Sequence, residues 1–211
     1  MTETPAIVFI VDDDASVREA LGRLIRSAGL RVEAFASAEE FLNRARTDAP
    51  SCLVLDVQLP DLSGLDLQRR MVDANNEMPI VFITGHGDIS MSVKAMKGGA
   101  VDFLTKPFDV ENLLEAVHRA VAKDVKDLSA EERTAEVLER VKLLTPRETE
   151  VFALVVTGML NKQIAGQLDI AEKTVKVHRA RVMEKMRAGS VAELVRLADQ
   201  AGVIVPTVEV S

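Results

Sequence analysis

The chain has 211 residues, a formal net charge of −7 and a single cysteine, so it can form one large or two small domains and no internal disulfide. The charge is uneven: residues 1–122 carry 12 basic and 19 acidic side chains, whereas residues 140–211 carry 11 and 8. An acidic first half followed by a basic tail indicates two functions, and the tail is suited to bind an anion such as nucleic acid. The absence of Trp and Tyr argues against a surface that stacks single-stranded bases. With no leader segment or membrane-length apolar stretch, we expect a soluble, cytoplasmic chain with no membrane partner.

The front half alternates short apolar runs with segments of helical period. Continuous apolar runs such as Cys52-Leu53-Val54-Leu55 are typical of parallel strands that are covered on both faces. The alternation predicts an α/β fold of the flavodoxin-like kind, with a doubly wound, five-stranded parallel sheet. The expected strands are residues 6–11, 31–36, 51–56, 79–84 and 101–105. The expected helices cover 15–28, a segment opening after Ser37, 63–71, 88–97 and 109–122, with Asp14, Ser37, Ser63 and Asp88 as caps.

Polar side chains stand where four of these strands end. Asp12-Asp13, Asp56, Thr84 and Lys106 fall at the carboxyl ends, which meet at one edge of a parallel sheet. Asp56 alone could equally be a cap for the next turn, and the whole set could be an acidic pocket with a paired lysine. Two acids, an acceptor aspartate, a hydroxyl and an ammonium group can also hold a divalent metal and a phosphoryl group, and we favour that interpretation.

The rest of the chain predicts helices only. A charged linker, residues 123–144, is expected to hold a helix over 130–143. After it, Thr145-Pro146-Arg147-Glu148 has the pattern of a helix start. We then expect a helix at 162–168 capped by Asn161, a turn at 169–171, a helix at 172–187 and a last helix from Ser190 to Ala201. Two helices joined by a three-residue turn form a helix-turn-helix. The predicted domains are thus residues 1–122, the linker 123–144, and an all-α domain at 145–211.

These residues resemble a known family. Asp12-Asp13, Asp56, Thr84 and Lys106-Pro107 resemble the receiver domain of two-component response regulators. The tail is similar to the LuxR-type DNA-binding domain of the FixJ/NarL group, and Gly85-His86-Gly87-Asp88 resembles the FixJ branch. The matching tail segments are Leu144-Thr145-Pro146-Arg147-Glu148, Asn161-Lys162-Gln163-Ile164-Ala165 and Thr174-Val175-Lys176-Val177-His178-Arg179.

The resemblance implies that a sensor histidine kinase transfers a phosphoryl group to Asp56. It also implies Mg²⁺ as the cofactor, bound by Asp13, Asp56 and the backbone carbonyl of Gln58, with Asp12 acting through water. The implied switch and phosphate-binding residues are Thr84, Phe103 and Lys106. By resemblance, Gln58 and His86 occupy variable positions that tune the lifetime of the phosphate in the family, whereas the residues themselves favour His86 as an ordinary loop residue. Phosphorylation is expected to pair two chains through the fourth helix, fifth strand and fifth helix, where Met91, Val93 and Met96 are apolar.

Double-stranded DNA is the partner expected for the tail. On the longer helix, Val175, Val182 and Met186 recur at helical spacing and should face inward. The opposite face is basic, and it could also be merely solvated. Ala171 at the helix start and Ala180 on the exposed face depart from the commoner family pattern. The expected DNA-binding residues are Lys173, Thr174, Lys176, Val177, Arg179, Arg181 and Lys185.

The last helix is expected to pair two tails on DNA. The apolar side proposed for that contact is Val191, Leu194, Val195, Ala198 and Ala201. The leading hypothesis is a phosphorylation-controlled transcription regulator that is not an enzyme and that has RNA polymerase as a further candidate partner. Two alternatives remain open at this point: a receiver that regulates an enzyme or stores phosphate, and a scaffold that acts through protein contacts alone.

Overall fold

The computed structural model describes residues 5–45, 47–85 and 89–202. The chain divides into two compact units, Met1–Leu128 and Ser129–Ser211. Within the described ranges, no helix combines the length and the apolar composition that crossing a membrane requires.

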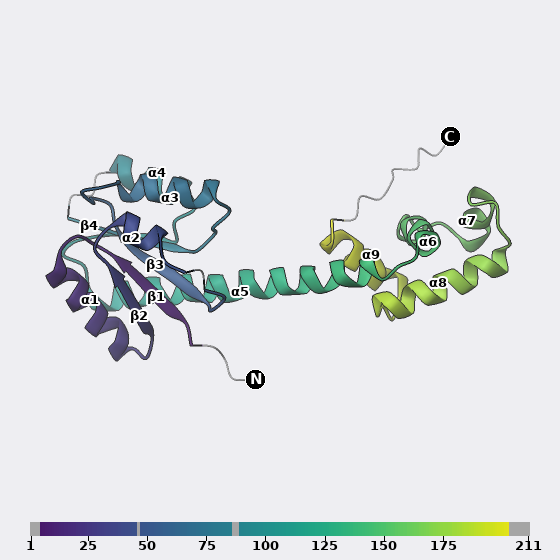
Figure 1. Cartoon of the computed structure of the whole chain (residues 1–211), viewed down its shortest axis with the longest axis horizontal. Coiled ribbons are helices and arrows are strands. Elements are labelled where there is room, and N and C mark those ends of the chain that lie inside the picture. Colours follow the sequence, from purple (N-terminus) through teal and green to yellow (C-terminus); the bar gives the residue numbers. More distant parts are fainter. Residues whose placement is uncertain (1–4, 46, 86–88, 203–211) are drawn as a thin grey trace. The chain divides into compact units, whose positions relative to one another are not determined.

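The first unit contains a five-stranded sheet in which every strand pair is parallel, as predicted (Figure 1). The strand order is β2-β1-β3-β4-β5, so the chain reverses its direction of winding between β1 and β3. In such sheets, ligand-binding sites form beyond the carboxyl ends of the strands next to this reversal. The strands are β1 (Ile7–Val11), β2 (Arg31–Phe35), β3 (Ser51–Asp56), β4 (Ile80–Thr84) and β5 (Asp102–Thr105).

Helices cover both faces of the sheet (Figure 1). They are α1 (Ala15–Ser27), α2 (Ala38–Leu42), α3 (Gly64–Asp73), α4 (Ile89–Lys97) and α5 (Val110–Lys142). Phe9 of β1 faces α2, α3 and α4, whereas its neighbours Val8 and Ile10 face α1 and α5. Cys52 is buried on the second of these faces, and burial raises the pKa of its thiol to about 12. The cysteine is therefore an unreactive core residue.

Helix α5 differs from the prediction. We expected one helix to end near residue 122 and another to start near residue 130, but α5 is continuous over 33 residues, Val110–Lys142. No Gly or Pro lies between Val110 and Lys142, so nothing interrupts the backbone hydrogen bonds. The box Ser129-Ala130-Glu131-Glu132, which predicted a helix start, lies inside the helix. A capping pattern thus marks the start of a helix only where the residues before it are not themselves helical.

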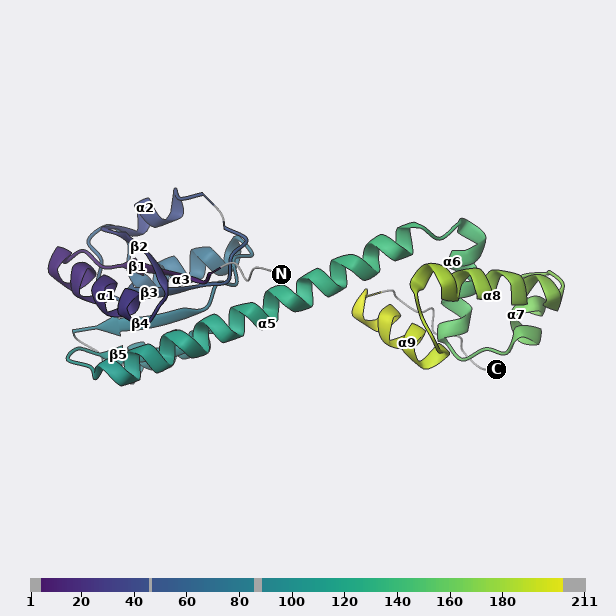
Figure 2. The same ribbon diagram turned by 90° about the horizontal axis from the view of Figure 1, so that it is seen from below.

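Four helices form most of the second unit (Figure 2). They are α6 (Pro146–Val156), α7 (Asn161–Gln167), α8 (Glu172–Met186) and α9 (Val191–Gln200). Their core includes Val137 from the last turns of α5 and the fully buried Phe152 of α6. The apolar side of α8 predicted to face inward does so, because Val175, Val182 and Met186 are all buried.

Most of the predicted caps are confirmed. The side chains of Asp14, Ser37, Ser63, Thr145 and Ser190 each accept a hydrogen bond from an N–H group in the first turn of their helix. Asn161 is not a cap: Leu160 occupies the cap position of α7, and its N–H donates to Oε1 of Gln163 at 2.7 Å. Ala171 leaves α8 without a side-chain cap, as expected. Asp88, the remaining expected cap, lies outside the described residues, as does His86.

Candidate functional site: an acidic pocket and an exposed helix face

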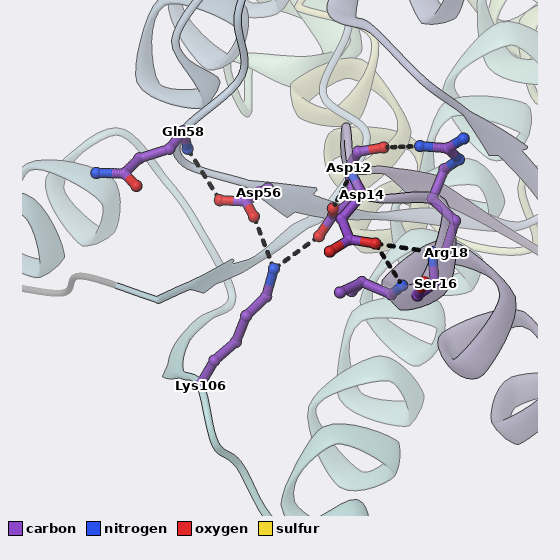
Figure 3. Close-up of polar contacts among 8 residues, drawn as sticks. Asp12, Asp14, Ser16, Arg18, Asp56, Gln58 and Lys106 are labelled. Carbon is purple, nitrogen blue, oxygen red and sulfur yellow. Dashed lines mark hydrogen bonds and ion pairs between the residues drawn. The ribbon is translucent and has the colours of Figure 1, made fainter.

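Three strand ends bring opposite charges together at one edge of the sheet. Asp12 follows β1, Asp56 ends β3, and Lys106 follows β5. The Nζ atom of Lys106 lies 2.7 Å from Oδ2 of Asp12 and 2.7 Å from Oδ2 of Asp56 (Figure 3). Both carboxylates are buried, whereas the lysine side chain is 24% exposed. The single ammonium group therefore neutralises part of a buried double negative charge.

The acid pair and Asp56 can also hold a cation. One carboxylate oxygen from each of Asp12, Asp13 and Asp56 lies within 4.8 Å of the other two. Asp13 is exposed and the other two are buried, so the cluster has one side open to solvent. Mg²⁺ prefers oxygen ligands and keeps several waters, which an open cluster of carboxylates allows. The donor set therefore fits Mg²⁺.

Burial and hydrogen bonds set the pKa values in opposite directions. Burial raises the pKa of Asp12, although the Lys106 ammonium and the backbone N–H of Asp14 partly offset it. Burial on its own would lower the pKa of Lys106, but hydrogen bonds to Asp12 and Asp56 outweigh burial and raise it. Lys106 is thus cationic at neutral pH. A second cation beside Asp12 would further lower the cost of its buried charge.

Asp14 serves the first helix. Its Oδ1 accepts hydrogen bonds from the N–H groups of Ser16 at 2.8 Å and Val17 at 3.3 Å (Figure 3). These bonds lower the pKa of its carboxyl group. The three adjacent aspartates therefore have different roles: Asp12 and Asp13 contribute carboxylates to the pocket, whereas Asp14 caps α1.

The loop after β3 fixes the position of Asp56. Oδ1 of Asp56 accepts a hydrogen bond from the backbone N–H of Gln58 at 2.9 Å (Figure 3). Gly64 closes the loop, because its N–H donates to the carbonyl of Val57 at 2.9 Å. A Cβ atom on Gly64 would lie only 2.4 Å from the carbonyl oxygen of Asp56. The turn-rich run Pro60-Asp61-Leu62-Ser63 before Gly64 is a sequence signal of the loop but not of this close contact.

Thr84 and Phe103 lie on the same face of the sheet. Phe103 pairs with Phe82 across β4 and β5, and Thr84 lies two residues beyond Phe82. Thr84 is fully buried, and its backbone carbonyl accepts a hydrogen bond from the N–H of Lys106 at 2.7 Å. Phe103 is half-buried beside Phe82, with ring centroids 6.3 Å apart. This shared face is the arrangement that a coupled movement of the two side chains requires.

The predicted DNA-binding residues of α8 separate into two groups. Most project from the exposed face, while Arg179 and Lys185 are partly buried and have partners within the unit. Arg179 donates from Nη1 to Oδ1 of Asn161 at 2.9 Å. The Lys185 ammonium lies 2.6 Å from Oε2 of Glu148 and 3.0 Å from the carbonyl of Leu143. The exposed group is Lys173, Thr174, Lys176, Val177 and Arg181.

The stripe expected to pair two tails through α9 belongs mostly to the core of the unit. Leu194 and Ala198 are buried, and Val191 packs against the same core. Val195 remains 39% exposed. The prediction that this whole stripe meets a second chain is therefore wrong. An amphipathic pattern shows that a helix buries one side, but it does not distinguish its own domain from a partner.

Two families match the chain. The response regulator receiver domain matches residues 8–118, and the LuxR family of bacterial regulatory proteins matches residues 142–198. The chain therefore belongs to the two-component response regulators of the FixJ/NarL group, with a receiver domain followed by a LuxR-type DNA-binding domain.

Individual relatives agree with this assignment. The chain is 52% identical over 200 residues to nodulation protein W of Bradyrhizobium diazoefficiens, covering 95% of this chain and 88% of that protein. It is 40% identical over 201 residues to the transcriptional regulatory protein FixJ of the same organism, covering 95% and 98% of the two chains. Among solved structures, the response regulator StyR matches with a TM-score of 0.83 and 46% identity, covering 93% of this chain and 100% of StyR.

Proposed function

We propose that this protein is a transcription regulator controlled by phosphorylation, in which a sensor histidine kinase transfers a phosphoryl group to Asp56. The observation that carries the proposal is the bridge from Lys106 to Asp12 and Asp56, at 2.7 Å on both sides. Asp56 is placed between a cation and a cluster of further carboxylates, at the sheet edge where ligands bind in this fold. We assign no catalytic residue, because the chain accepts the group rather than turning over a substrate.

The transfer requires a nucleophile and a compensating positive charge. A carboxylate oxygen of Asp56 forms the new P–O bond as the P–N bond to the kinase histidine breaks, and the imidazole nitrogen keeps the electron pair. Lys106 is already positioned and charged, so it can stabilise negative charge on the transferring group without rearrangement. The N–H of Gln58 holds the other oxygen of Asp56 and orients the carboxylate.

Mg²⁺ is the cofactor that we propose for this pocket. Asp12, Asp13 and Asp56 would hold it, together with the backbone carbonyl of Gln58. When bound, Mg²⁺ would supply a second positive charge against the phosphoryl oxygens. The buried carboxylates of Asp12 and Asp56 would benefit from this second positive charge even before transfer, because the single ammonium group of Lys106 is shared between them.

The consequence that we propose for phosphorylation is pairing of two receivers. Thr84 would move toward the phosphate, and Phe103 would turn inward into the space that Thr84 leaves. The surface formed by α4, β5 and α5 has apolar side chains to bury, since Ile89 is 84% and Met96 47% exposed. Met91, by contrast, packs against the core of the sheet. A receiver pair would raise the local concentration of its two tails on neighbouring DNA half-sites.

The tail would bind double-stranded DNA through the exposed face of α8. Lys173, Lys176 and Arg181 offer cations to phosphates and guanine edges, and Val177 offers an apolar contact to a thymine methyl group. We leave Lys185 out of this set because its ammonium is bound within the unit. RNA polymerase is the further partner that a regulator at a promoter would meet, and the cytoplasm is the compartment in which it would act.

A gel shift with fragmented genomic DNA, with and without acetyl phosphate and Mg²⁺, tests this function. We expect a shift that acetyl phosphate strengthens and that the Asp56→Asn variant keeps at the unphosphorylated level. Phosphate uptake without any DNA shift would instead indicate a phosphate store or a scaffold.

A further inference from the structure

Arg179 joins the two helices of the helix-turn-helix. Its Nη1 donates to Oδ1 of Asn161 at 2.9 Å, and both residues are half-buried. Asn161 is the first residue of α7, yet its side chain does not cap that helix, whose leading N–H at Leu160 is bound by Gln163. The carboxamide oxygen of Asn161 therefore serves the contact between helices.

The position of Arg179 along α8 separates it from the exposed cations. It follows Val175 by four residues and precedes Val182 by three, so it continues the buried stripe of the helix. Lys176 and Arg181 lie on other sides and are exposed. The side chain of Arg179 thus starts on the face that packs against the rest of the unit.

The turn between α7 and α8 gives weak control over the angle between them. It spans residues 168–171, Ala171 has no side chain that caps α8, and the burial of Ile164 and Val175 in the shared apolar core has no preferred direction. The Asn161–Arg179 hydrogen bond joins the helices at points well away from that turn. A charged donor makes a strong and directional hydrogen bond. This contact therefore fixes the angle between α7 and α8 at a distance from the turn, where a small rotation of one helix displaces its side chains most.

We infer that Arg179 is a positioning residue: through Asn161 it sets the orientation of α8 relative to α7, and it thereby determines which DNA sequence the exposed face of α8 can recognise. The inference rests on the proposed DNA-binding function and deepens it. Arg179, which the sequence placed among the DNA contacts, acts in this account through Asn161 and not on a base or a phosphate.

The test uses full-length protein with beryllofluoride and a duplex that wild type has selected from random DNA. Affinities for this duplex and for unrelated DNA are measured over a series of salt concentrations. For Asn161→Ala and for Arg179→Met, we expect the ratio of specific to unrelated affinity to fall about tenfold, with the salt dependence unchanged. The double variant should be no worse than either single variant, because both remove the same bond. Asn161→Asp, which keeps the acceptor, should retain the wild-type ratio.

Arg181→Met is the matched control, since it removes the same charge from the exposed face of the same helix. Loss of a phosphate contact there should reduce the salt slope by about 0.9. An equal reduction for Arg179→Met, or a wild-type specificity ratio for Asn161→Ala, would overturn the inference while leaving the proposed function intact. If wild type itself selects no sequence, the proposed function fails and this inference fails with it.

Discussion

At the scale of single residues, Lys106 neutralises part of the negative charge of the pocket. Two buried carboxylates, those of Asp12 and Asp56, share its ammonium group at equal distances. Arg18 also contacts Asp12, but it binds the backbone carbonyl at 2.6 Å and not the carboxylate. The site thus has a deficit of positive charge that suits a divalent cation. In the proposed mechanism, phosphorylation would add further negative charge at the same place, so the acceptor would need both Lys106 and Mg²⁺.

Asp56 is expected to be the phosphoacceptor. Asp56→Asn keeps the shape of the side chain but removes the nucleophilic oxygen, so uptake of label from a small phosphodonor with Mg²⁺ should vanish. Asp14→Asn is the control, because it makes the same change at the neighbouring aspartate, whose side chain caps α1, and asparagine still caps a helix. Label retained by Asp56→Asn would show that another residue accepts the group.

Gly64 is expected to tolerate no side chain. In Gly64→Ala the new methyl group would meet the Asp56 carbonyl at 2.4 Å, and overpacking of this kind typically costs about 1–3 kcal/mol. Gly22→Ala is the control in the same unit, since its methyl group meets only the flexible end of Arg26 and alanine favours a helix interior. Urea unfolding should show the first variant destabilised and the second unchanged or more stable. Equal stability of Gly64→Ala and wild type would refute this account of the loop.

At the scale of helices and strands, the hydrophobic pattern predicted most elements, while contacts between distant residues could not be predicted. Parallel β3 could be recognised because all four of its central residues are apolar. The bond from the Ser51 N–H to the Asp124 carboxylate, 2.7 Å long, joins residues 73 positions apart and left no local signal. Likewise, Asn161 has the composition of a cap, but only the fold shows that it binds Arg179 instead. The gathering of Asp12, Asp56 and Lys106 could be predicted, because the carboxyl ends of parallel strands meet at one edge of the sheet.

The contact between α6 and the end of α8 should make the tail sensitive to acid. The hydrogen bond from Lys185 and that from the backbone N–H of Thr145 lower the pKa of Glu148 to about 2. A carboxyl group with a lowered folded pKa stabilises the fold above its unfolded pKa, near 4.5, and this contribution is lost as the pH falls toward 2. Glu148→Gln should therefore lower stability by about 1–3 kcal/mol at pH 7 and by progressively less below pH 4.5.

Urea titrations followed by the NMR methyl signal of Met186, which is buried in the core of the tail, measure this difference. Lys142→Met serves as a control for general charge effects, because Lys142 pairs with Glu139 on the surface. A gap between wild type and Glu148→Gln that stays constant from pH 7 to pH 3 would contradict the assignment of the pKa to this bond.

At the scale of the whole molecule, phosphorylation can control DNA binding only if a signal passes from the first unit to the second. The structure places the acceptor pocket in one unit and the exposed cations of α8 in the other. A phosphate can shift the state of the protein only by its differential affinity for two arrangements. Pairing of receivers is the mechanism we propose, because it changes DNA binding through concentration and requires no fixed arrangement of the two units.

Thr84 is expected to be required for that pairing and dispensable for phosphorylation. Thr84→Ala removes the hydroxyl group that would bind the phosphate, whereas Asp56, Lys106 and the acid pair remain. Sedimentation with and without beryllofluoride should show a large gain of dimer for wild type and little for the variant. An equal gain in both would exclude the route through Thr84 and Phe103, while leaving Asp56 as the acceptor.

The most direct test of the central claim is the affinity of the full-length protein for its selected DNA duplex, measured with and without beryllofluoride in the presence of Mg²⁺. We predict that beryllofluoride tightens binding at least about tenfold for wild type and has no effect on Asp56→Asn. Equal affinity of wild type in both conditions would contradict control of DNA binding by phosphorylation, and an equal gain in Asp56→Asn would contradict Asp56 as the point of control.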